Sequence, residues 1–155
     1  VTCFAQAYDI LFDPTKYRPE SRETADHSLP YCMAAAMVDK KITTESFSDE
    51  KLKDPRIYEV IDKIIGEPSQ EFEKMFPAKQ PSRVVVTTID GREFEEYLEY
   101  PKGDPREPMT MNDLENKFNS LAGDKFSDGM KAQLKEHIFN CDNLSAVQFI
   151  ENLNV

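Results

Sequence analysis

The stretch that decides the fold is RETADHSLPYCMAAAMVD, residues 22–39. Its second half is almost entirely apolar, and three consecutive alanines favour a helix that another element can approach closely. Pro30 suits the first turn of a helix, and the residues just before it include good N-caps. We therefore predict a buried helix over residues 26–39, with His27, Ser28 and Tyr31 as a polar cluster at its start.

The two histidines of the chain allow different interpretations. His27 is either a satisfied histidine of a capped core helix or a titratable group at the mouth of a site, and the residue types alone leave both open. His137 shares a helical stripe with Met130, Leu134 and Ile138, which favours packing over chemistry.

Composition narrows the class of protein. The 155 residues suit one domain, and 39% hydrophobic residues are enough for a core. A formal net charge of −10 argues against a nucleic-acid surface and against docking on anionic membranes. No apolar run approaches the roughly 20 residues of a membrane span. Because the sequence begins at Val1 without a methionine or a signal peptide, we expect either a removed leader or part of a longer protein.

The cysteines and the missing motifs argue against metals and cofactors. Cys3, Cys32 and Cys141 are too far apart for a disulfide framework or a zinc site, so we expect three reduced thiols in a cytoplasmic protein, with Cys32 packed inside the helix. Phosphate-loop, dinucleotide, zinc-protease and calcium-loop motifs are absent from the sequence. We therefore predict neither a cofactor nor a metal.

The first ninety residues predict a mixture of elements. We expect a strand over about the first seven residues, a loop over residues 13–24, and a helix from Asp54-Pro55 to Ile65, stopped by Gly66. A polar connector over residues 67–82 follows, pinned to the core by three apolar side chains: Phe72, Met75 and Phe76. Two strand-like runs then flank Asp90-Gly91, which predicts a type I′ hairpin with a central first strand and an edge second strand.

The last third predicts a shaped loop and three helices. The loop Gly103–Arg106 is either a rigid turn or a means of presenting a guanidinium to a carboxylate. Helices follow over residues 110–122 and 127–139, and a short one begins at Ser145. This order predicts an α+β fold: one domain over residues 1–155, with a small, mainly antiparallel sheet and helices packed on it as a two-layer sandwich.

Several short motifs together resemble the MmgE/PrpD family, specifically its second domain. In chain order they are HSLPY at 27–31, TESF at 44–47, DPRI at 54–57, DG at 90–91, KGDP at 102–105, PMT at 108–110 and ENKF at 115–118. The likeness extends over nearly the whole chain. It implies that a helical first domain of the same longer chain, absent from this sequence, is a partner, and that the second domain acts as a lid over the substrate.

The resemblance also implies a function. Family members include 2-methylcitrate dehydratases, cis-aconitate decarboxylases and iminodisuccinate epimerases, so we expect a metal-independent lyase, in the first place a dehydratase of 2-methylcitrate in propionate catabolism. The expected partners are a small tricarboxylate and a second copy in a cytoplasmic homodimer, with no nucleic acid and no membrane. We expect the 155-residue chain to be inactive alone.

Within this domain the resemblance makes His27 a pocket or interface group, supported by Ser28 and Tyr31, with Tyr17 as a further candidate. A binding or assembly module that kept the fold without the chemistry is the alternative. If the domain is a lid without its partner, an apolar patch should be exposed near the 29–38 helix or the sheet.

Overall fold

The computed structural model describes residues 1–123 and 125–153, and the chain divides into two compact units. Unit 1 is Val1–Pro108 and contains every strand, whereas unit 2 is Met109–Val155. Each unit is described by itself. The prediction of a single domain over residues 1–155 stays a prediction.

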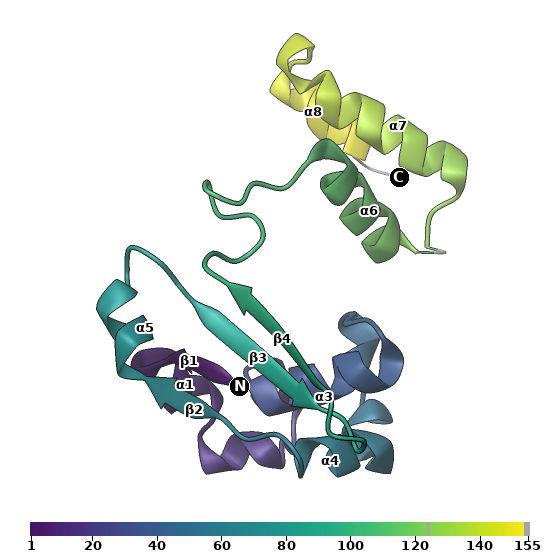
Figure 1. The fold of residues 1–155 in the computed structure, drawn as a ribbon. Coiled ribbons are helices and arrows are strands. Elements are labelled where there is room, and N and C mark those ends of the chain that lie inside the picture. Colours follow the sequence, from purple (N-terminus) through teal and green to yellow (C-terminus); the bar gives the residue numbers. More distant parts are fainter. Residues whose placement is uncertain (124, 154–155) are drawn as a thin grey trace. The chain divides into compact units, whose positions relative to one another are not determined.

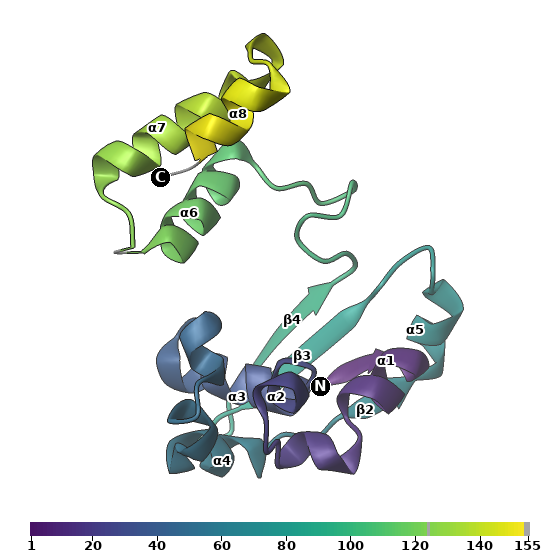
Figure 2. The ribbon, with the colours of Figure 1, turned by 180° about the vertical axis from the view of Figure 1, so that it is seen from behind.

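Unit 1 contains a four-stranded mixed sheet in the order β2-β1-β3-β4 (Figure 1). The strands are β1 (Thr2–Phe4), β2 (Glu67–Ser69), β3 (Ser82–Thr87) and β4 (Glu93–Leu98). β1 pairs with β2 in parallel, and the other two pairings are antiparallel. Helices α1 (Ala5–Leu11) and α5 (Gln70–Met75) pack against β1, as both ribbon views show (Figures 1 and 2). The predicted α+β class, with a mainly antiparallel sheet, is confirmed.

The prediction of a strand over about the first seven residues is wrong in length. β1 ends at Phe4 and α1 begins at Ala5, because the segment AQAYDIL is richer in helix formers than in β-branched residues. The loop predicted over residues 13–24 also contains structure. A 3-10 helix, η1 (Pro14–Tyr17), is capped by the Asp13 side chain, and helix α2 (Arg22–Asp26) is capped by Ser21.

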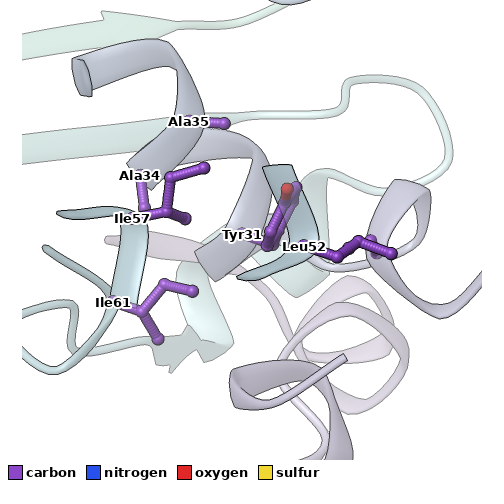
Figure 3. Packing of buried hydrophobic residues seen from close by; sticks show 7 residues of the cluster. Tyr31, Ala34, Ala35, Leu52, Ile57 and Ile61 are labelled. Carbon is purple, nitrogen blue, oxygen red and sulfur yellow. The ribbon is translucent and has the colours of Figure 1, made fainter. Parts of the chain in front are cut away.

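The buried helix exists but begins three residues later than predicted. Helix α3 spans Leu29–Asp39, with Ser28 as its N-cap, and it ends where Lys40 adopts a left-handed conformation. Two 3-10 helices, η2 (Thr44–Phe47) and η3 (Lys51–Lys53), lead to helix α4 (Pro55–Ile61). α3 and α4 pack together around the core cluster shown in Figure 3. Its members are Ala25, Tyr31, Ala34, Ala35, Leu52, Ile57 and Ile61.

Helix α4 ends at Ile61, four residues earlier than predicted, because the chain has to join the sheet. The backbone nitrogen of Val1 donates to the Ile65 carbonyl at 2.6 Å, and the Glu67 amide donates to the Val1 carbonyl at 2.8 Å. After one hydrogen-bonded turn at Lys63 and Ile64, these bonds draw the segment toward β1.

The prediction of a polar connector over residues 67–82 is also wrong, because this segment contains β2 and α5. Ser69 caps α5 by accepting from the Phe72 amide at 3.2 Å. The prediction that three apolar side chains pin this segment is confirmed for two of them: Phe72 is buried, and Phe76 stacks on Phe4 with ring centroids 4.6 Å apart. Met75 is half-buried.

The β3–β4 hairpin has the predicted strands but a different turn. β3 is central and β4 is the edge, as predicted. The Gly91 amide donates to the Thr88 carbonyl at 2.9 Å, and Gly91 has φ +82° whereas Asp90 does not have positive φ. A type I′ turn needs positive φ at both central residues, so that prediction is wrong. The structure has a three-residue loop closed by glycine.

Of the two interpretations of the Gly103–Arg106 loop, the structure supports the rigid turn. Arg106 forms a two-point pair with the Asp104 carboxylate, at 2.7 and 2.8 Å, and its guanidinium lies over the Tyr100 ring at 4.1 Å. It also donates to the Ala78 carbonyl. These contacts use the guanidinium within unit 1.

Unit 2 contains helices α6 (Met111–Ala122), α7 (Asp128–Phe139) and α8 (Ala146–Leu153), with a 3-10 turn, η4 (Cys141–Asn143). Thr110 and Ser127 cap the first two helices. His137 is half-buried on α7, and its Nδ1 is without a hydrogen-bond partner within the described part of the chain. None of the helices in residues 1–123 and 125–153 has the length and apolar character needed to cross a membrane.

Candidate functional site

His27 lies between two helices rather than inside one. It is the C-cap of α2 and immediately precedes Ser28, the N-cap of α3. Its side chain is 65% exposed. The ring Nδ1 lies 3.0 Å from the Glu23 carbonyl oxygen and 2.5 Å from Asp26 Oδ1, so both acceptors favour a proton on Nδ1.

This arrangement raises the pKa of His27 above its usual value. The main cause is the hydrogen bond to the Glu23 carbonyl, followed by the hydrogen bond and the charge of Asp26, while nearby Lys16 acts in the opposite direction. Nε2 has no hydrogen bond to any residue that the structure describes. In the neutral ring Nε2 can accept a proton, and in the charged ring it can donate to a carboxylate.

Ser28 holds the backbone rather than the imidazole. Its hydroxyl donates to the Lys16 carbonyl at 2.6 Å and accepts from the Tyr31 amide at 3.0 Å, and the residue is buried. These two bonds attach the η1 segment to the start of α3. Ser28 therefore fixes the position of His27 through the chain, without touching its ring.

Tyr31 is part of the core. It is fully buried, and its hydroxyl donates to the Ser46 carbonyl at 2.8 Å. Burial raises the pKa of Tyr31 to about 12, so the phenol stays neutral. Its side chain points into the cluster with the α4 isoleucines, as Figure 3 shows.

Tyr17 is half-buried at the end of η1, and it lines a surface hollow with Tyr8, Phe12, Pro14 and two aspartates, Asp9 and Asp13. Burial raises the pKa of Tyr17. The structure thus gathers the four predicted residues onto neighbouring segments but gives them separate environments, with only His27 largely exposed. The site prediction stays a prediction.

Comparison with known proteins decides the family. Residues 1–142 match the family model described as the MmgE/PrpD C-terminal domain. The chain belongs to the MmgE/PrpD family.

Curated relatives of this MmgE/PrpD domain carry the name cis-aconitate decarboxylase. The Aspergillus terreus protein is 26% identical over 140 residues, which cover 88% of this chain and 28% of that protein. The Mus musculus protein is 30% identical over 104 residues, covering 67% and 21% respectively. The Homo sapiens protein is 28% identical over 141 residues, covering 87% and 28%. The chain therefore spans less than a third of the length of these relatives.

Sequence reasoning missed the two groups that act on His27 in this MmgE/PrpD domain, namely the Asp26 carboxylate and the Glu23 carbonyl. The only available signal was the Asp26-His27 dipeptide. It also missed an Arg18 guanidinium that pairs with Asp62 and lies 5.4 Å from the centre of the Tyr58 ring.

Metal-ligating groups are not gathered in the described part of the domain. Across residues 1–123 and 125–153, no three or more His, Cys, Asp or Glu side chains are placed to hold one ion. The three cysteines are free, as predicted, and burial raises the pKa of Cys32, which keeps that thiol protonated.

Proposed function

We propose that this domain is part of a lyase that acts on a tricarboxylate, with decarboxylation of cis-aconitate as the reaction. The observation that carries the proposal is the match to proteins named cis-aconitate decarboxylase, at 26–30% identity over most of the chain. Dehydration of 2-methylcitrate, which the family resemblance implies, is the second candidate. A cytoplasmic homodimer stays a prediction for the longer protein.

His27 is the residue of this domain that we assign to the substrate. A tricarboxylate carries several negative charges, and this chain has a net charge of −10, so a substrate-facing cation has to be placed locally. The raised pKa of His27 keeps its proton to higher pH, and its exposed Nε2 is available to donate to a carboxylate. Ser28 and Tyr31 act as positioning residues because they hold the start of α3.

Both reactions need the same help from a protein. In decarboxylation, the bond between a carbon and one carboxyl group breaks, CO₂ leaves, and the electron pair left on carbon takes up a proton. In dehydration, a base removes a proton beside a carboxylate and the hydroxyl leaves as water. Each develops negative charge next to a carboxylate, which hydrogen-bond donors and cations stabilise. A protonated His27 supplies one such donor, and we assign the remaining groups to the longer protein.

The test is turnover by the longest reading frame that contains this sequence, with the 155-residue chain assayed in parallel. Cis-aconitate, 2-methylcitrate and iminodisuccinate are offered separately, and products are followed by proton NMR. We expect the longer protein to convert cis-aconitate into its decarboxylated organic product, with loss of CO₂, and the short chain to form none.

The matched control uses the other histidine. His27→Gln should lower kcat/KM by roughly ten- to a hundredfold. His137→Gln, on α7 of unit 2, should leave it near the wild-type value. If 2-methylcitrate is the only compound converted, the reaction is the dehydration named as the second candidate. Failure of the longer protein on all three compounds refutes lyase function and favours a binding module.

A further inference from the structure

A second candidate site lies on unit 1, in the hollow beside Tyr17. Its six lining residues are Tyr8, Asp9, Phe12, Asp13, Pro14 and Tyr17. Three of them are aromatic and adjacent: the Tyr8 and Phe12 rings stack with centroids 5.5 Å apart, and the Phe12 and Tyr17 centroids are 6.3 Å apart. The sequence predicts Tyr17 as a site residue but does not predict this grouping.

The charged groups in the lining are both carboxylates. Asp9 is exposed, and its carboxylate forms neither a hydrogen bond nor an ion pair with the described residues. Asp13 is held by the Thr15 hydroxyl and amide, at 2.6 and 3.0 Å, which lowers its pKa and keeps it ionised. Lys16 is close enough to act on Asp13, but it does not line the hollow. The hollow is therefore negative.

The aromatic wall is fixed from behind. Phe12 is only 3% exposed, and Gly66 approaches it so closely that a Cβ there would lie 2.4 Å from the ring. The Gly66 backbone also lies near enough to the Tyr17 hydroxyl to lower its pKa, against the larger effect of burial. Asp13 is held in place as the N-cap of η1. The rings and one carboxylate thus keep their positions without a ligand, which lowers the ordering cost of binding.

We propose that this hollow binds an alkylammonium group, through the half-buried Tyr8 and Tyr17 rings and the carboxylates of Asp9 and Asp13, with the buried Phe12 ring holding the two tyrosines in place. Aromatic faces attract cations, most strongly organic cations that are weakly hydrated, and carboxylates supply the opposite charge. A metal ion is less suited, because the hollow offers only two carboxylates and hard cations require more oxygen ligands. A tricarboxylate is repelled, so this site is separate from the proposed function and does not depend on it.

The test is an NMR titration of the isotopically labelled 155-residue chain. Choline is compared with its neutral isostere 3,3-dimethylbutan-1-ol and with magnesium chloride at equal ionic strength. We expect choline to shift the amide signals of Tyr8, Phe12, Tyr17 and Gly66. Binding of the isostere should be roughly three- to tenfold weaker, because it lacks the cation–π attraction.

Two variants test whether the carboxylate of Asp9 contributes to binding. Asp9→Asn removes the unpaired carboxylate and should weaken choline binding several-fold, whereas Asp128→Asn, at a fully exposed aspartate of unit 2, should not. A lysine amide is titrated in the same way. If lysine amide gives the stronger response, the bound ammonium group belongs to a protein side chain. If choline gives the stronger response, it belongs to a free compound. Either result supports the site. Equal binding of choline and the isostere, a matching response to magnesium, or no shift at these four amides overturns the proposal.

Discussion

Replacing Gly66 by alanine tests how tightly the aromatic cluster of unit 1 is packed. A Cβ at this position would lie 2.4 Å from Phe12 Cδ1 and 2.6 Å from Cε1 and Cγ. Carbon atoms in ordinary contact are about 3.5–4.0 Å apart, so the ring has to retreat by about 1 Å. Phe12 is buried between Tyr8 and Tyr17, which leaves little room for this movement.

The size of the effect follows from the cost of overpacking. One extra methyl group in a well-packed site typically costs about 1–3 kcal/mol, and the short distance to a ring places Gly66→Ala in the upper half of that range. A loss of this size is a large part of the ~5–15 kcal/mol that stabilises a typical domain.

The assay is urea unfolding followed by circular dichroism and tyrosine fluorescence, since the chain lacks tryptophan. Gly129→Ala is the matched control. Its Cβ would meet nothing nearer than Ser127 Oγ at 3.9 Å, and within helix α7 alanine should stabilise by up to about 1 kcal/mol. The two substitutions should therefore shift the midpoint in opposite directions. If Gly66→Ala unfolds at the wild-type urea concentration, the packing argument fails.

Three further outcomes are expected. Tyr31→Phe should cost about 1–3 kcal/mol of unfolding free energy in urea, because the buried Ser46 carbonyl loses its partner; a neutral effect would contradict this. The pKa of His27, measured by NMR titration, should lie above its ordinary 6.5 and fall in Asp26→Asn; the stability that it contributes is present below pH 6.5 and is lost as pH rises through the folded-state pKa. Asp104→Asn should destabilise unit 1 near neutral pH. Because the Arg106 hydrogen bonds lower the pKa of Asp104 to about 2, the difference from wild type should disappear as pH falls from 3.8 to about 2. A difference in unfolding free energy that persists at the lower pH would contradict this expectation.

The features that the sequence predicted well are held by bonds between near neighbours. Asp54 accepts from the Arg56 amide at 3.0 Å, and Thr110 from the Asp113 amide at 3.2 Å, so each cap depends on residues two or three positions apart. Such contacts are visible in a short window of sequence. The two strands of the hairpin are predictable for the same reason, but their register is not. A two-residue turn at Asp90-Gly91 would pair Thr88 with Glu93, whereas the three-residue loop pairs Thr87 with Glu93.

The features that the sequence missed depend on distant residues. Strand β2 has only three residues, two of them exposed, and it exists because Glu67 and Ser69 pair with β1 more than sixty positions away. No local pattern marks such a strand. At the candidate site, the residue types were identifiable but their geometry was not. His27 lies outside α3, so it does not share a helical face with Tyr31 four residues later.

The β3–β4 hairpin provides a test of the proposed longer protein. On one face of the pair, Val86 lies opposite Phe94, and these side chains are 37% and 55% exposed; Leu98, on the same face, is 51% exposed. The predicted apolar surface near the sheet is thus present in this chain. If the domain covers a pocket built by the rest of a longer chain, this face is a place where the two parts meet.

Phe94→Ser and Leu98→Ser separate the two possibilities. In the 155-residue chain each should lower the free energy of unfolding by about 1 kcal/mol, because close to half of each side chain is already buried. In the longer protein, burial of the same side chains would raise the cost to roughly 1.5–3 kcal/mol each. Glu95→Gln, on the other face of β4, should have a small effect in both. If Phe94→Ser and Leu98→Ser cost no more in the longer protein than in the 155-residue chain, this face stays in water, and the covering role has to be assigned to another surface.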